Sequence, residues 1–159
     1  MGNIVLARID DRLIHGQVMT AWVQHTGGNE IVIADDKVAK DPFLCAVITG
    51  AVPKHLKAQA MTLKDAAAYL KEKEDEQERK FIILTKGPDA YLELIQSGVN
   101  IQEINLGGMG SRQGRTKLYK NISAGQDERD MFQELTEKNV HIYIQVVPNT
   151  EKVELNKVL

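Results

Sequence analysis

The sequence predicts an α/β fold: a single-domain open, mainly parallel β-sheet with helices on both faces. Short runs rich in isoleucine and valine alternate along the whole chain with longer amphipathic segments. Several of these runs are nearly all apolar, as strands buried on both faces are. The 159 residues suit one domain with one sizeable core, because domains commonly run to about 100–150 residues. We therefore expect one domain over residues 1–159.

The predicted strands share a run of apolar residues bounded by polar or turn-forming ones. They are Ile4–Ile9, Glu30–Ala34, Lys57–Met61, Phe81–Thr85, Ile101–Leu106 and His141–Val147, of which Lys57–Met61 has the weakest signal. Lys117–Ser123 is an additional candidate strand. For the tail, Asn149–Leu159, a short helix and a further edge element both remain open.

The predicted helices carry recognisable start or stop signals. Asp41 stands before Pro42, a capping residue before proline at the first helical position. Thr62 and Asp65 form a capping pair, and Gly98 is placed to end a helix. The helical segments are a stretch from Gly16 or Gln17 through Val18, Trp22 and Val23, a stretch from Pro42, and Ala66–Lys73, Pro88–Gln96 and Asp127–Lys138.

Composition excludes several classes of function. Lys and Arg number 20 and Asp and Glu number 22, so no basic excess indicates nucleic acid as a partner. Cys45 is the one cysteine, which excludes an internal disulfide and zinc-type spacing and indicates a buried structural thiol. We expect no metal and no cofactor. The charged run Glu72–Lys80 indicates a solvated helix end and loop.

The N-terminal residues do not have the form of a signal peptide, and no run approaches the ~20 apolar residues of a membrane helix. We therefore expect a cytoplasmic protein that reaches a membrane only through partners. Homo-oligomerisation remains open.

The segment after the first predicted strand carries the strongest chemical signal. It runs from Arg8 to Gln17 and places His15 just before a predicted helix, at the sheet edge where α/β folds bind ligands. A helix N-terminus disfavours positive charge, so a neutral imidazole with a nucleophilic lone pair is expected there. After phosphorylation, the same N–H groups would stabilise the phosphoryl oxygens. Arg12 could add charge-assisted hydrogen bonds.

Two neighbouring acids, Asp10 and Asp11, need a role that does not repel phosphate. We expect one to hold the unreactive ring nitrogen of His15 or a loop N–H, and the other to pair with Arg8 or Arg12. The residues alone do not assign which acid does which. A plain polar turn after a strand is the alternative interpretation of this segment.

This segment, RIDDRLIHGQV, resembles the active-site segment of the enzyme IIB subunit of the mannose/fructose/sorbose class of sugar phosphotransferase systems. A second segment, NLGGMGSRQGRT from Asn105 to Thr116, is similar to the glycine loop of the same family. Chain length and element order agree as well, so the resemblance covers essentially the whole chain. One departure is Arg115, where the family often has lysine.

The resemblance implies a phosphoryl carrier. His15 would be phosphorylated at Nδ1 by a phosphohistidine of enzyme IIA, and would pass the group to a sugar held by the membrane subunits IIC and IID. It implies His15, Arg12 and Asp10 as catalytic residues. It also places phosphate or partner contacts at Arg8, Asp11, Gly16, Gln17, Gly108, Met109, Arg112 and Arg115. The identity of the sugar cannot be read from the chain.

Two other kinds of protein share features with this segment. A phospho-aspartate receiver also has paired acids after its first strand, but it needs an acceptor aspartate after its third, where this chain reads AQAM. A non-catalytic module would bind a phosphorylated small molecule through the same loop. The glycine loop itself is no dinucleotide fingerprint, because Gln113 stands at the third glycine position.

The remaining polar candidates have ordinary structural interpretations. His25 is expected at a helix C-terminus, His55 on the surface and His141 at a strand end. Asp35 and Asp36 are expected to cap a helix, with recognition of a basic partner as the alternative. Lys86 follows a predicted strand, and whether it faces the site remains open.

Overall fold

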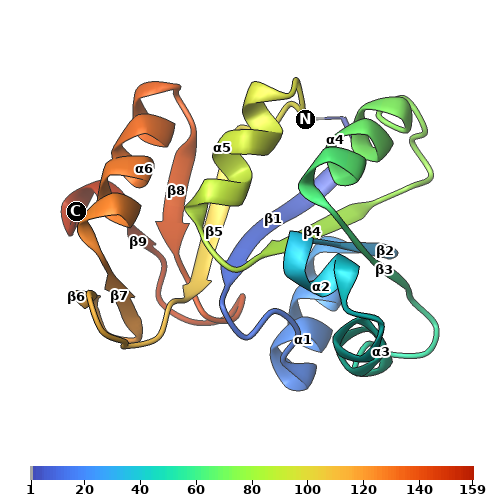
Figure 1. Cartoon of the computed structure of the whole chain (residues 1–159), viewed down its shortest axis with the longest axis horizontal. Helices are drawn as coiled ribbons and strands as arrows, with labels where there is room; N and C mark the ends of the chain where they lie inside the picture. The colour runs from blue at the N-terminus through green and yellow to red at the C-terminus, as the bar shows by residue number, and fades with distance from the viewer. Residues whose placement is uncertain (1) are drawn as a thin grey trace.

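The computed structural model describes residues 2–159 and contains one seven-stranded sheet with helices on both faces (Figure 1). The strand order is β3-β2-β4-β1-β5-β8-β9, and every pairing is parallel except that of β8 with β9. The strands are β1 (Ile4–Asp10), β2 (Glu30–Ala34), β3 (Lys57–Met61), β4 (Phe81–Thr85), β5 (Glu103–Gly108), β8 (His141–Ile144) and β9 (Val153–Glu154). A separate antiparallel hairpin joins β6 (Thr116–Tyr119) to β7 (Ile122–Ala124).

Two helical layers enclose this sheet, and each layer has its own core. One layer packs against one face and contains α1 (Gly16–Thr26), α2 (Asp36–Lys40) and α3 (Pro42–Gly50). The other contains α4 (Leu63–Glu72), α5 (Pro88–Gln96) and α6 (Gln126–Glu137). Figure 1 shows α4, α5 and α6 along one side of the sheet and α1 and α3 on the opposite side.

Strand alternation divides the apolar residues between the two cores. In β4, Phe81 and Ile83 belong to the core beneath α4, α5 and α6, whereas Ile82 and Leu84 belong to the core beneath α1 to α3. Successive side chains of a strand point to opposite faces, so a run of consecutive apolar residues serves both layers. This explains why the central strands lack an alternating polar pattern.

The predicted fold class is confirmed, and most predicted elements are present. Three predicted strands have the observed bounds of β2, β3 and β4. Asp41 and Thr62 cap α3 and α4 through their side chains, which accept hydrogen bonds from the N–H groups of Leu44 and Asp65. Cys45 is half-buried and packs against the core beneath α1 to α3. No helix within residues 2–159 has the length and apolar character needed to cross a membrane.

Several elements differ from prediction or were left open. β5 starts two residues later than Ile101 and runs on through Gly107 and Gly108, and β8 ends at Ile144. The candidate strand Lys117–Ser123 is the β6–β7 hairpin, which turns at Lys120 and Asn121. α2 was not predicted, because five residues are too few to show helical periodicity. The tail forms both open alternatives, an edge strand and a 3-10 helix over Leu155–Lys157.

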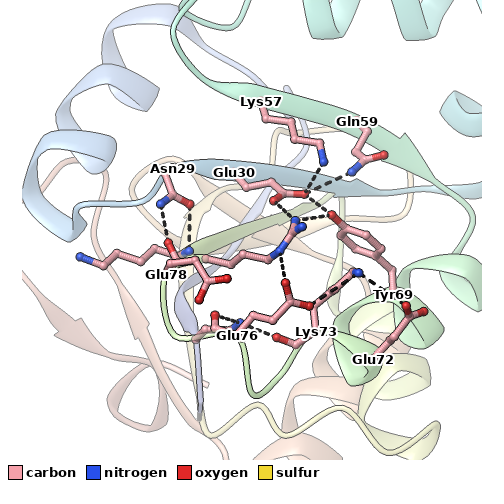
Figure 2. A network of polar contacts seen from close by, with 12 residues as sticks. Asn29, Glu30, Lys57, Gln59, Tyr69, Glu72, Lys73, Glu76 and Glu78 are labelled. Carbon is pink, nitrogen blue, oxygen red and sulfur yellow. Dashed lines mark hydrogen bonds and ion pairs between the residues drawn. The ribbon is translucent and has the colours of Figure 1, made fainter.

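The amino edge of the sheet holds a buried carboxylate, shown in Figure 2 with Lys57, Gln59 and Tyr69 around Glu30. Glu30 is 4% exposed and accepts hydrogen bonds from Tyr69 Oη (2.5 Å), Arg79 Nη1 (2.9 Å) and Gln59 Nε2 (3.2 Å). Arg79 also contacts Glu76 at 2.9 Å. The charged run Glu72–Lys80 is therefore tied to the sheet at this edge as well as being largely exposed.

Candidate active site

The candidate site lies at the opposite, carboxyl edge of the sheet, where β1 leads into α1. β1 is central, between β4 and β5, so the loop that follows it is flanked by the loops of both neighbours. His15 occupies the N-cap position of α1 with extended backbone, and its side chain is exposed. Gly16 and Gln17, the first residues of α1, are exposed beside it.

The start of α1 differs from that of the three helices that follow it. Asp35, Asp41 and Thr62 each accept a backbone N–H hydrogen bond at the start of α2, α3 and α4. The side chain of His15 makes no such bond, and the first turn of α1 contains no acidic residue. The N–H groups of this turn therefore remain available to an external anion.

Leu13 fixes the shape of the loop between β1 and α1. Its backbone lies in the left-handed region, with φ of 61°, and its N–H donates to the carbonyl oxygen of Asp10 at 2.8 Å. A left-handed backbone is unfavourable for leucine by roughly 1–2 kcal/mol. The side chain is 2% exposed in the core beneath α1, and burial of a leucine contributes about 1.5–3 kcal/mol. Core packing thus offsets the strain and anchors the loop.

Asp10 is the central carboxylate of the site and is 1% exposed. Its Oδ1 accepts from the backbone N–H of Arg12 (3.1 Å) and from Arg12 Nε (2.9 Å), while its Oδ2 accepts from Arg12 Nη2 (2.8 Å). Arg8 Nη2 donates to the same Oδ2 at 3.1 Å. The carboxylate therefore lies between two arginines, one on each side.

The two arginines differ in exposure. The side chain of Arg12 is 46% exposed, whereas that of Arg8 is 1% exposed. Burial alone would raise the pKa of Asp10, but the hydrogen bonds of Arg12 and the charges of both arginines outweigh it and hold that pKa below its usual value. The hydrogen bond to Asp10 raises the pKa of Arg12. Asp10 is thus a fixed anion, and Arg12 is the cation that it presents to solvent.

The glycine loop after β5 is joined to the β1–α1 loop by backbone contacts. Asp11 N–H donates to the carbonyl oxygen of Gly108 at 3.1 Å, and Asp11 Oδ2 accepts from Gly110 N–H at 2.7 Å. Asn121 Nδ2 donates to the carbonyl oxygen of Gly107 at 2.9 Å, which connects the β6–β7 hairpin to the same strand end. The two sequence segments that carried the family resemblance are therefore in direct contact.

Arg115 and Arg112, both in the glycine loop, have different surroundings. Arg115 makes two bonds to Glu128, with Nε at 2.9 Å and Nη2 at 2.7 Å, and donates to the carbonyl oxygen of Gly110 at 2.8 Å. Its side chain is 4% exposed, so it holds the loop together. Arg112 is 65% exposed and lies 3.7 Å from Glu128, which leaves its guanidinium accessible.

A polar cavity of about 670 Å³ opens at the same edge, beyond the ends of β1, β2 and β4. Lys86 lines it and lies 3.5 Å from Asp35, so Lys86 does face this edge of the sheet. Acids and bases both line the cavity, including Asp11, Arg112 and Arg115. His15 is not among the lining residues.

One acid was expected to hold the His15 ring or a loop N–H, and the other to pair with an arginine. The structure contains the loop N–H contact and the arginine pairing. Asp10 pairs with both arginines, and Asp11 holds the loop N–H of Gly110. Neither carboxylate makes a hydrogen bond to the ring of His15 within the described chain. Orientation of the imidazole by an aspartate is therefore not part of this geometry.

Three of the residues predicted to contact phosphate or a partner have enclosed side chains. They are Arg8 and Met109, each 0% exposed as a residue, and Arg115, whose side chain is 4% exposed. Arg8 sits on a strand at the centre of the sheet, and Arg115 is engaged by Glu128. Gly108 is also buried and meets Asp10 rather than solvent. Arg8, Met109 and Gly108 are therefore shielded from solvent, whereas Arg115 still lines the polar cavity.

Three residues have roles that were not predicted. Asn105 and Gly107 belong to the second segment of the resemblance but were given no contact, and Glu128 was not named. Asn105 Oδ1 accepts from Arg8 Nη1 at 2.5 Å. A Cβ added at Gly107 would lie 2.1 Å from Arg8 Cζ. The available signal was the i, i+2 spacing of Arg8 and Asp10, which places both on one face of β1.

The remaining candidates occupy the expected structural positions. His25 is exposed at the end of α1, His55 is exposed after α3, and His141 is exposed at the start of β8. Asp35 caps α2, and Asp36 accepts from Leu63 N–H at 2.8 Å.

Comparisons with known proteins agree on one family. Residues 4–159 match the PTS system sorbose subfamily IIB component. The chain is 33% identical over all 159 residues to the N-acetylgalactosamine-specific phosphotransferase enzyme IIB component 2 of Escherichia coli, covering 100% of each. It is 30% identical over 152 residues to the mannose-specific EIIAB component of Escherichia coli, covering 96% of this chain and 47% of that protein.

A solved structure agrees as well. The IIBSor domain of the sorbose permease from Klebsiella pneumoniae superposes with a TM-score of 0.92 at 33% identity, covering 98% of this chain and 96% of that one.

Proposed function

Since this chain belongs to the sorbose subfamily of phosphotransferase-system IIB components, and so to a sugar phosphotransferase system, we propose that His15 is the residue that carries the phosphoryl group. The observation that supports this most directly is the start of α1. An exposed histidine stands at a helix N-terminus that no side chain caps, three residues after the exposed Arg12 in the same loop. A phosphoryl group on His15 would supply the anion that this terminus lacks.

In the proposed cycle, His15 accepts the group from a phosphohistidine of enzyme IIA. A ring nitrogen of His15, expected to be Nδ1, attacks phosphorus, and the P–N bond of the donor breaks with its electron pair returning to the donor imidazole. The group then leaves for a hydroxyl of a sugar held by the membrane subunits IIC and IID. A mannose-specific relative is named EIIAB, which supports a IIA partner.

Arg12 supplies the charge stabilisation. Asp10 engages its Nε and one N–H of Nη2, so Nη1 and the other N–H of Nη2 stay free. These free groups form one edge of the guanidinium fork, which matches two oxygens of a phosphoryl group. Phosphoryl transfer depends mainly on positioning and electrostatic stabilisation, and this geometry offers both.

The test is to mix the chain with a phosphorylated enzyme IIA of this class and to map any covalent phosphate by mass spectrometry. We expect an acid-labile, base-stable phosphate on His15, absent in His15→Ala and retained in the matched control His25→Ala. Transfer should persist with a chelator, because no step needs Mg²⁺ on this subunit. An aspartyl phosphate, or a strict Mg²⁺ requirement, would support the receiver interpretation, and phosphate binding without an adduct would support a non-catalytic module.

A further inference from the structure

We propose that the buried Arg8 is a positioning residue for phosphoryl transfer: acting through Asp10, it orients Arg12 and keeps the positive charge of Arg12 from being cancelled. This inference rests on the proposed function, because Arg12 matters only if a phosphoryl group arrives at His15. Arg8 touches neither His15 nor solvent. Its role is therefore distinct from direct phosphate contact.

Arg8 is held from several directions at the centre of the sheet. Its Nη1 donates to Asn105 Oδ1 (2.5 Å) and to the carbonyl oxygen of Gln145 (3.2 Å), while Nη2 donates to Asp10. Its Cζ lies 5.6 Å from the centre of the Trp22 ring. Asn105 in turn donates to the carbonyl oxygen of Gln145 at 3.0 Å. Elements β1, β5 and α1 and the segment after β8 thus fix one guanidinium.

This fixed guanidinium limits where the Asp10 carboxylate can go. Asp10 Oδ2 accepts from Arg8 on one side and from Arg12 Nη2 on the other. Because Arg8 holds the carboxylate of Asp10 in place, the carboxylate in turn holds Arg12 in one position. Long arginine side chains lose much rotamer freedom when they are held, so an exposed arginine needs such an anchor to keep a single geometry.

The charges lead to the same conclusion. Asp10 and Arg12 alone would form a neutral pair, which would attract a phosphoryl group weakly. Arg8 adds a second positive charge on the far side of Asp10, so the three groups together carry a net charge of about +1 under ordinary aspartate and arginine ionisation. The exposed member of the trio is Arg12. The site thereby obtains the geometry of a salt bridge without losing its cationic character.

Stability alone explains this arrangement poorly. Buried ion pairs can often be replaced by well-packed apolar residues without loss of stability. The chain also accommodates Arg8 at a local cost, because a glycine inside a strand is unfavourable by roughly 0.5–1 kcal/mol relative to alanine. Gly107 stands in β5 where any Cβ would lie 2.1 Å from Arg8 Cζ and Nη2. The absence of a side chain at position 107 makes room for the guanidinium of Arg8, which indicates that this group has a role beyond stability.

The test is a double-mutant cycle between Arg8→Met and Arg12→Ala, with kcat/KM for phosphoryl transfer onto His15 as the readout. Arg8→Met should lower kcat/KM about tenfold when Arg12 is present, which corresponds to about 1.4 kcal/mol. It should cause no further loss in the Arg12→Ala background. Arg8→Lys should recover part of the rate, because it restores the charge but not the forked contacts. Equal losses in both backgrounds would show that Arg8 is only structural and overturn the proposal.

A second variant covers the case in which Arg8→Met does not fold. Gly107→Ala keeps every charge and displaces only the guanidinium, so it should also slow transfer when Arg12 is present. Its effect should shrink in the Arg8→Lys background, because lysine lacks the two crowded Nη atoms and only its flexible chain end occupies the place of Cζ. A folded Gly107→Ala protein with the original rate would contradict the proposal.

Two controls separate the possible failures. Glu30→Gln removes a carboxylate at the opposite edge of the sheet and should lower stability without slowing transfer at a temperature where the protein is folded. If the original chain takes no phosphate on His15, the proposed function itself fails. If His15 is phosphorylated normally but the cycle shows no coupling, only the role of Arg8 is wrong.

Discussion

Each edge of the sheet buries a carboxylate beside an arginine. The contacts of one carboxylate stay within the fold, whereas those of the other hold an arginine at the surface. At the amino edge, Glu30 is surrounded by Tyr69, Gln59 and Arg79, and its contacts tie the segment after α4 to β2 (Figure 2). At the carboxyl edge, Asp10 lies between a buried and a half-exposed arginine. A buried carboxylate can therefore serve to close an edge or to present a cation at it.

The kind of contact distinguishes the two edges, because Glu30 also has two cationic partners, Arg79 at 2.9 Å and Lys57 at 3.7 Å. Glu30 takes two of its close contacts from neutral groups, the Tyr69 hydroxyl and the Gln59 amide, which satisfy it within the fold. Asp10 takes its side-chain contacts from two guanidinium groups, and only one of them is enclosed. The free donors of Arg12 are available to an anion, and under the proposed function that anion is the phosphoryl group on His15.

Replacing Arg12 should give the largest effect. Arg12→Ala should lower kcat/KM for transfer onto His15 about a hundredfold, since each charge-assisted hydrogen bond to a phosphoryl group contributes about 1.5–3 kcal/mol. Unfolding should change little, because the side chain is half-exposed and Asp10 keeps Arg8. Rate assays with phosphorylated enzyme IIA and thermal unfolding together check this. If the Arg12→Ala protein is unfolded, the contacts of Asp10 serve stability, as those of Glu30 do at the amino edge, and the prediction is wrong.

Glu30→Gln should give an intermediate effect, which falls on the stability of the protein and not on the rate of transfer. The neutral amide loses the ion pair with Arg79, and its NH2 group, which can only donate, faces other donors where a carboxylate oxygen accepted. The free energy of unfolding should therefore fall by about 1–2 kcal/mol. Transfer onto His15 should be unchanged below the unfolding transition. Chemical denaturation with a parallel transfer assay measures both. A slower transfer in a fully folded variant would contradict the separation of the two edges.

The smallest effect should be a pH dependence at the amino edge. His141 lies 2.9 Å from Glu103 and also bonds Glu154 of β9, and it stacks on Tyr143, which Lys152 covers from another side. Burial lowers the pKa of His141, but the hydrogen bonds of the two carboxylates outweigh it, so the pKa is raised. The resulting stability is fully present below the unfolded pKa of about 6.5 and is lost as pH rises through the folded pKa.

His141→Gln should therefore remove a decline in unfolding free energy over the pH range that begins at about 6.5 and extends upward through the raised pKa of His141. Denaturation of both proteins at several pH values measures this. The original protein should be favoured over the variant most strongly at the acidic end of that range. Parallel curves for the two proteins would mean that the His141 contacts do not change with protonation.

Sequence patterns predicted the sheet well because its central strands are uniformly apolar. Glu30–Ala34 and Phe81–Thr85 are bounded by polar residues, so their ends were visible. β5 was misplaced because Gly107 and Gly108 look like a turn when only local preference is considered. The reason that they continue the strand, close approach of Arg8, lies in a distant part of the sequence.

The sequence named the exposed residues of the proposed site, His15 and Arg12, and two buried ones, but none of the distant partners that hold the buried arginine. His15 and Arg12 belong to one short segment, and the start of a helix was visible there. The partners of Arg8 come from β5 and from the segment after β8, so no local pattern could join them. Arg8 itself was expected near phosphate, because a sequence shows the charge of a residue but not its depth.

The close approach of Gly107 to Arg8 also bears on how such a chain can change over generations. A larger residue at position 107 is compatible only with a shorter one at position 8, and an arginine regained at position 8 requires the glycine again. A larger residue at position 107 alone gives a protein with crowded atoms, and a shorter residue at position 8 alone gives one with an empty space beside Gly107. The two positions are therefore expected to vary together among descendants of this sequence, although they lie in different strands far apart along the chain.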